Sequence, residues 1–152
     1  MTKPTSLAIV IPAWKPDFFA QALDSIARQT DRDFHVYIGD DAGSPSLAAI
    51  AAERLSDTPH TYHRFSENLG GKDLVAHWER CLDLVGDEEW VWLFSDDDTM
   101  ASDCVERFHR TRREIASDLY HFPLGVIDES SQPLQSPQGL DYRDIEEFLR
   151  GR

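Results

Sequence analysis

The chain has 152 residues, with 28 Asp and Glu against 15 Lys and Arg, and so a formal net charge of −13. This length supports one domain with a sizeable core, and an apolar fraction of 41% is that of an ordinary globular protein, which excludes wholesale disorder. The acidity argues against a nucleic-acid partner, because such binding depends on Lys and Arg that neutralise phosphates. A phosphorylated ligand would need a metal cation between itself and this protein.

Short apolar runs alternate with segments of helical periodicity. Leu7–Ile11 is continuously apolar, as in a strand buried on both faces, and Asp17–Gln29 repeats apolar residues at helical spacing. The further expected strands are Phe34–Gly39, Thr61–Phe65, Trp90–Phe94 and Leu119–Phe122, and the further expected helices are Ser44–Leu55, Leu74–Val85 and Asp103–Ile115. This alternation predicts an α/β fold with a mostly parallel sheet, right-handed crossovers and helices on both faces.

Two other features concern the ends of elements and the location of the protein. Ser44 is expected to cap its helix, with Pro45 at the first helical position, and residues 128–141 are expected to form a loop or hairpin before a short helix at Tyr142–Leu149. There is neither a signal peptide nor an apolar run of about 18 residues. Cys81 and Cys104 lack metal-site spacing, so we expect free thiols in a cytoplasmic protein.

Acidic residues follow two of the expected strands. Asp40 and Asp41 come after the second strand, and Asp96, Asp97 and Asp98 come after the fourth. Ligands of open parallel sheets bind at the carboxyl ends of the strands. Consecutive carboxylates repel one another, and Mg²⁺ or Mn²⁺, which prefer hard oxygen ligands, would relieve that repulsion. The alternative is that these residues are solvated turn formers and helix caps.

Four segments together resemble the family-2 glycosyltransferases. They are Ile9–Lys15, Asp40–Pro45, Glu67–Gly70 and Trp92–Asp98, in the order and spacing of that family. The resemblance implies a three-layer GT-A fold that is Rossmann-like and binds a nucleotide sugar. It implies a donor-binding domain over residues 1–127, with residues 128–152 beginning an acceptor-side region.

The resemblance also implies roles for individual residues. Pro12, Ala13 and Trp14 match the segment that holds the nucleotide base. Asp41 matches the carboxylate that accepts a hydrogen bond from the base, with Asp40 beside it, and Asn68 and Gly70 match a loop under the ribose and diphosphate. Within the DxD region, the residues matched to the metal are Asp97 and Asp98, and Asp96 is matched to the nucleotide sugar.

The sequence departs from the family pattern at several positions. Trp14-Lys15 stands where Tyr-Asn is usual, Ser95 stands where an aspartate commonly opens the DxD pattern, and Gly43 lengthens the loop after Asp41. The general base of such enzymes lies on the acceptor side, beyond Phe148, so no catalytic base is assigned and we expect a donor-binding piece of a larger enzyme.

The reaction that the resemblance implies is an inverting transfer from a UDP- or GDP-linked sugar to a saccharide or lipid-linked acceptor, as in polysaccharide biosynthesis. Such a protein could associate with the inner face of the membrane without a transmembrane segment. Two other classes remain open: a metal-dependent nucleotidyl or phosphoryl transferase, and a non-catalytic receiver-like or nucleotide-binding module. The receiver-like class lacks support at the first strand, which ends in Pro12 rather than in carboxylates.

Overall fold

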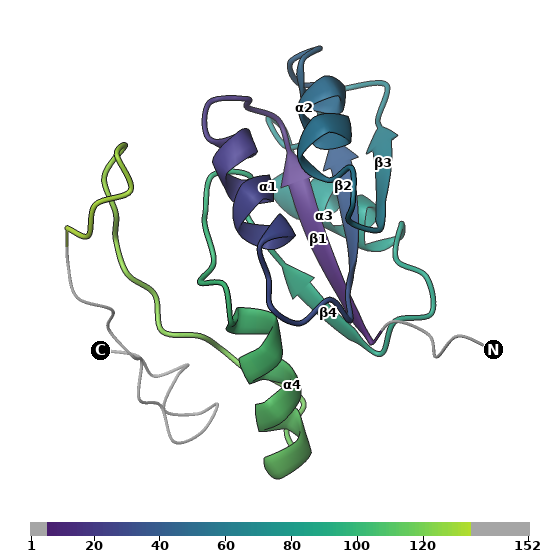
Figure 1. Ribbon diagram of the computed structural model, residues 1–152. Coiled ribbons are helices and arrows are strands. Elements are labelled where there is room, and N and C mark those ends of the chain that lie inside the picture. Colours follow the sequence, from purple (N-terminus) through teal and green to yellow (C-terminus); the bar gives the residue numbers. More distant parts are fainter. Residues whose placement is uncertain (1–5, 135–152) are drawn as a thin grey trace, which may run out of the picture. The chain divides into compact units, whose positions relative to one another are not determined.

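Four parallel strands form the centre of the computed structural model, which describes residues 6–134 (Figure 1). The strands are β1 (Leu7–Ala13), β2 (His35–Asp40), β3 (His60–Arg64) and β4 (Trp90–Leu93). Their order in the sheet is β3-β2-β1-β4, and all three pairings are parallel. The predicted α/β fold with a parallel sheet is therefore confirmed.

Helices cover both faces of this sheet. They are α1 (Phe19–Ala27), α2 (Leu47–Arg54), α3 (Leu74–Leu82) and α4 (Cys104–Glu114). In Figure 1, α1 and α2 lie on one face and α3 lies on the other, which gives the three layers expected of a Rossmann-like domain. No helix within residues 6–134 is both long enough and apolar enough to cross a bilayer.

The central strand β1 explains why the sheet is stable. Its residues from Leu7 to Ile11 are almost completely buried, since side chains on both faces of the strand meet helices. Ala8 and Val10 pack with Tyr37 and Cys81 beneath α3. Each fully buried Leu or Ile contributes about 1.5–3 kcal/mol relative to an exposed one, so β1 is a rigid base for the loop that follows it.

Gln29 fixes the connection between β4 and α4. This buried side chain follows α1, donates to the carbonyl of Ala101 at 2.7 Å and accepts from the amide of Val105 at 3.0 Å. Farther along α4, the ring of His109 contacts the carbonyl of Asp33 at 3.1 Å through Nε2. The segment between β4 and α4 is thus anchored at both ends.

Three details differ from the sequence-based expectations. The second helix begins at Leu47 rather than at Ser44, because the amide of Leu47 donates to the Ser44 carbonyl in a preceding turn and the Ser44 side chain caps no helical amide. Leu119–Phe122 is not a strand, since no partner strand pairs with it among the described residues. Trp78 is 38% exposed, although its place in the apolar stripe predicted a core residue.

The chain divides into two compact units, with the division after Glu114. In the second unit, the backbone reverses direction around residues 128–132, where Ile127 and Pro133 form an antiparallel bridge. This agrees with the predicted hairpin, while the predicted helix at Tyr142–Leu149 lies outside the described residues. The predicted boundary between donor and acceptor regions at residue 127 stays a prediction.

Candidate functional site

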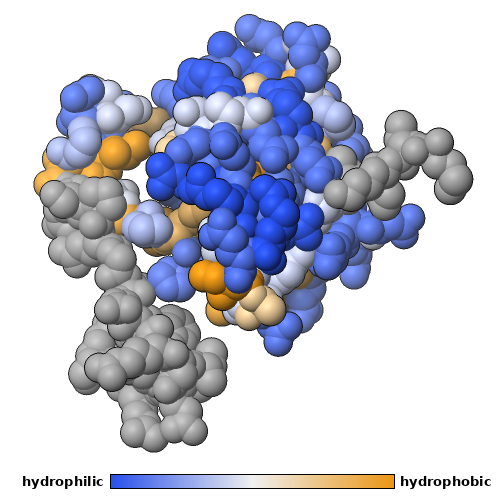
Figure 2. Space-filling model, turned by 60° about the horizontal axis from the view of Figure 1, so that its bottom comes forward, coloured by the Kyte–Doolittle hydropathy of each residue, from blue (hydrophilic) through white to orange (hydrophobic). Residues whose placement is uncertain are grey.

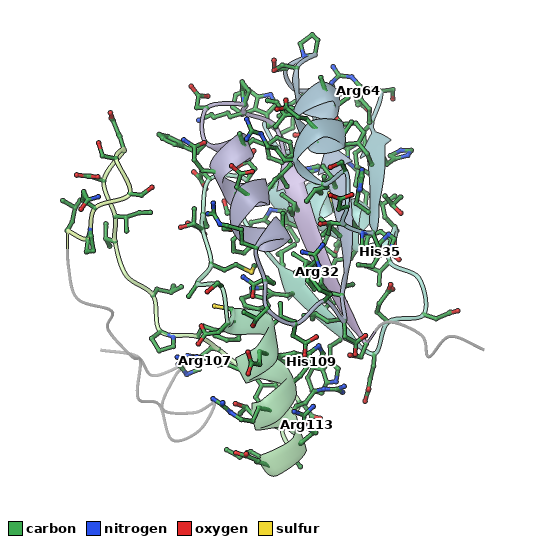
Figure 3. The ribbon with its side chains drawn as sticks, in the orientation of Figure 1. Arg32, His35, Arg64, Arg107, His109 and Arg113 are labelled. Carbon is green, nitrogen blue, oxygen red and sulfur yellow. The ribbon has the colours of Figure 1, made fainter. Side chains whose placement is uncertain are left out.

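The candidate site is built from loops that leave the carboxyl ends of neighbouring strands. Because β1 lies between β2 and β4, the segment Trp14–Lys15 lies between Asp40–Asp41 and Ser95–Asp98. Arg64, the last residue of β3, lies at this end of the sheet (Figure 3). The arginines of α4 lie at the opposite end, where Figure 2 shows a largely hydrophilic surface.

Asp96 joins the loop after β4 to the loop after β1. Its Oδ2 atom accepts hydrogen bonds from the backbone amides of Trp14 at 2.8 Å and Lys15 at 3.1 Å. The two amides are consecutive, so they converge on one carboxylate oxygen as in a backbone anion-binding nest. The third described loop also reaches this segment, since the amide of Asp41 donates to the carbonyl of Ala13 at 2.8 Å.

Trp14 presents an aromatic surface at the centre of these loops. The residue is 51% exposed, whereas Ala13 before it is fully buried at the end of β1. The ammonium of Lys15 lies 5.4 Å from the centroid of the indole ring, which is within the range of a cation–π contact. An exposed ring on an anchored backbone provides a face on which a nucleobase can stack.

Asp97 and Asp98 are exposed beside this ring. The hydroxyl of Ser95 donates to Oδ1 of Asp97, so the serine that replaces the usual aspartate orients the neighbouring carboxylate. Partial burial, together with the negative charges of Asp97 and Asp96, raises the pKa of Asp98 above its ordinary value. A cation bound here would relieve that repulsion.

The residues present fit a Mg²⁺ or Mn²⁺ ion of the kind that a bound diphosphate completes. Among residues 6–134, no three His, Cys, Asp or Glu side chains are placed to hold a metal by themselves. Mg²⁺ commonly uses only one or two protein carboxylates and takes its other ligands from phosphate oxygens and water. Asp97 and Asp98 could supply those carboxylates, and Asp96 already accepts two amide hydrogens.

Asp41, in contrast, is an internal anion. It is 2% exposed and accepts hydrogen bonds from the amides of Leu69 and Gly70, both at 2.8 Å, and from the side chain of Asn68 at 2.9 Å. The guanidinium of Arg80 forms an ion pair with the same carboxylate. These contacts fold residues 68–70 around Asp41, so the structure brings together the three predicted members of that group. The predicted contact of Asp41 with a base stays a prediction.

Asp40 is also satisfied by the protein. It is completely buried, accepts from the hydroxyl of Tyr62 at 2.6 Å and from the amide of Gly43 at 2.7 Å, and forms an ion pair with Arg64. Burial and the neighbouring Asp40 carboxylate raise the pKa of the Tyr62 hydroxyl, which remains a hydrogen-bond donor. Asp40 therefore closes the turn after β2 and ties it to β3.

Arg80 is a central residue of the site that sequence reasoning missed. Its guanidinium stacks on Phe65 at 3.9 Å from the ring centroid, donates to the carbonyl of Glu67 at 3.0 Å, and donates through Nε to Nδ1 of His77 at 3.1 Å. Burial lowers the pKa of His77, which suits the neutral acceptor that this hydrogen bond requires. Helical spacing could have placed Arg80 and His77 on one face, next to the buried Cys81.

Comparison with known proteins gives the family. The model of glycosyl transferase family 2 matches residues 8–136. The chain belongs to this family. No curated protein matches the chain significantly.

Solved structures of this fold include S. aureus TarS. A TarS structure superposes with a TM-score of 0.64 and 17% sequence identity, over 72% of this chain and 20% of TarS. A structure of TarS 1–349 in complex with UDP-GlcNAc superposes with a TM-score of 0.65 and 17% identity, over 72% of this chain and 31% of that protein. The family-2 chain described here thus spans about a third or less of those TarS chains, and the likeness supports the GT-A fold predicted from the sequence.

Proposed function

We propose that this family-2 chain binds a nucleotide-sugar donor at the loops after β1, β2 and β4, and that it supplies the donor half of a metal-assisted glycosyl transfer. The observation that carries the proposal is the exposed ring of Trp14, whose backbone is held by Asp96 next to the free carboxylates of Asp97 and Asp98. A stacking surface beside a carboxylate pair matches the two ends of a nucleoside diphosphate. Family membership favours this function over nucleotidyl transfer and over a receiver-like module.

The chemistry that we propose is an inverting displacement. An acceptor hydroxyl, belonging to a saccharide or lipid-linked acceptor, loses its proton to a base and attacks the anomeric carbon, while the bond to the nucleoside diphosphate breaks. A bound Mg²⁺ or Mn²⁺ would act as a Lewis acid that stabilises the negative charge of the departing diphosphate. The residues of this chain bind and orient the donor: Trp14 holds the base, and Asp97 and Asp98 hold the cation.

A uridine nucleotide is the first donor to test, because one TarS structure contains UDP and another contains UDP-GlcNAc. The test is calorimetric titration of the chain with UDP and with GDP, each in Mn²⁺ and again with excess chelator. We expect UDP to bind more tightly in Mn²⁺ than in chelator. Absence of UDP and GDP binding in both conditions would contradict the proposal.

A further inference from the structure

The three consecutive aspartates after β4 have different surroundings. Oδ2 of Asp96 accepts two backbone hydrogen bonds from the loop after β1, whereas Asp97 accepts from the hydroxyl of its neighbour Ser95. A hydrogen bond to an ionised carboxylate is about twice as strong as one between neutral groups. The carboxylate of Asp96 is therefore engaged with the protein, and its contacts lie on the side of the nucleobase surface.

The backbone of Trp14 is also held from the opposite side, by the loop after β2. The amide of Ser44 donates to the carbonyl of Trp14 at 3.4 Å, and the backbone of Gly43 lies so close that a Cβ atom there would be 2.3 Å from the same oxygen. Asp96 and the segment Gly43–Ser44 thus hold the peptide groups on either side of one residue. That residue has an exposed indole ring, which is the arrangement of a rigid stacking surface.

We propose that Asp96 is a positioning residue: it holds the Trp14–Lys15 backbone so that the indole ring is set for the donor base, and it is not a ligand of the cation. This inference rests on the proposed donor site and assigns separate tasks within the aspartate run. Without Asp96, two adjacent amides lose their common acceptor, and the loop after β1 gains alternative conformations. The loss then falls on base stacking, which does not depend on a metal.

The experiment measures UDP affinity in excess chelator and again in Mn²⁺. Asp96→Ala removes the acceptor, whereas Asp96→Asn removes the charge and keeps an acceptor oxygen. Asp97→Ala is the comparison variant for the cation. Asp103→Asn is the matched control, because Asp103 lies in the same connection but pairs with Arg107 and has no printed contact with the loop after β1. Thermal melting of each variant checks that the fold is retained.

We expect Asp96→Ala to weaken UDP binding about tenfold in chelator and by a similar factor in Mn²⁺, as expected for loss of one stacking interaction. Asp96→Asn should retain most of the affinity in both conditions. Asp97→Ala should lose only the gain that Mn²⁺ provides, and Asp103→Asn should bind like the wild type. In a Trp14→Ala background, Asp96→Ala should cause little further loss, because its effect passes through the ring.

Two results would overturn the inference while the proposed function stands. In the first, Asp96→Ala and Asp96→Asn both lose only the Mn²⁺-dependent part of UDP binding, which would make Asp96 a cation ligand. In the second, the effects of Asp96→Ala and Trp14→Ala on UDP affinity simply add. A wild-type chain that binds neither UDP nor GDP in either condition would overturn the proposed function and this inference together.

Discussion

Two acidic segments follow strands of the same sheet, yet they differ in what their carboxylates contact. Asp40 and Asp41 are buried and surrounded by donors from β3, α3 and the loop at 68–70. Asp97 and Asp98 are exposed, and the charges around Asp98 raise its pKa. The comparison teaches that an acidic strand end can be either a structural anion or a place for a ligand. The number of protein donors around it distinguishes the two.

The largest expected effect is on the buried segment. Asp41→Asn should lower the free energy of unfolding by about 3–5 kcal/mol, because the variant leaves the partly buried Arg80 without its ion pair and disturbs two amide hydrogen bonds. Urea denaturation measures this change. Asp97→Asn, at an exposed position, is the control and should change stability by at most about 0.5 kcal/mol. Equal losses in the two variants would remove the distinction between the segments.

The next effect tests whether Arg80 acts through Asp41. Arg80→Ala should cost about 2–3 kcal/mol of unfolding free energy, since it removes the ion pair and the stacking on Phe65. Combined with Asp41→Asn, the two losses should fall short of their sum by about 1 kcal/mol or more, as in other directly contacting pairs. Strict additivity in the double mutant would contradict the shared network.

Gly43→Ala tests the close approach between the loops after β1 and β2. A Cβ atom at this position would meet the backbone of Trp14 at 2.3 Å, so one of the two loops must shift, at a cost of about 1–3 kcal/mol. UDP affinity should fall as well, because the shift moves the backbone that carries the indole ring. Gly86→Ala, whose nearest contact is the Tyr37 hydroxyl at 3.1 Å, is the control. Unchanged UDP affinity in Gly43→Ala would show that the ring tolerates the shift.

The smallest effect concerns Asp98. Because the pKa of this carboxyl is raised from 3.8 in the folded protein, its ionisation opposes folding as the pH rises through that pKa. In chelator, Asp98→Asn should therefore be slightly more stable than the wild type at pH 7, and the difference should vanish below about pH 3.9, the ordinary pKa of Asp. Melting temperatures across that pH range measure it. A destabilised Asp98→Asn at pH 7 in chelator would contradict the proposed repulsion.

Much of the fold could be predicted because its strands are short and apolar and are followed by helical segments. The apolar run at Leu7–Ile11 predicted the central strand, and the structure confirms it. The segment Leu119–Phe122 has similar composition but is no strand, and its Leu119 is 72% exposed. A strand needs a hydrogen-bonded neighbour, and composition does not show whether one is in place. The same limit explains Ser44, which suits a cap but lies in the turn before the helix.

The candidate site divides in a similar way. Strand ends, aspartates and Trp14 could be read along the chain, because the carboxyl ends of parallel strands share one edge of a sheet. The donors that neutralise Asp41 could not, since Arg80 lies 39 residues farther along the chain on another helix.

The sequence by itself determined which residues stand at the carboxyl edge of the sheet, because the apolar periodicity sets where each strand ends. Only the tertiary structure decided which carboxylates are already satisfied there. Whether a carboxylate is satisfied depends on donors brought from β3, α3 and the loop after β1, and hydrogen bonds form only at contact distance. Aspartates that look equivalent along the chain therefore have different tasks in the folded protein.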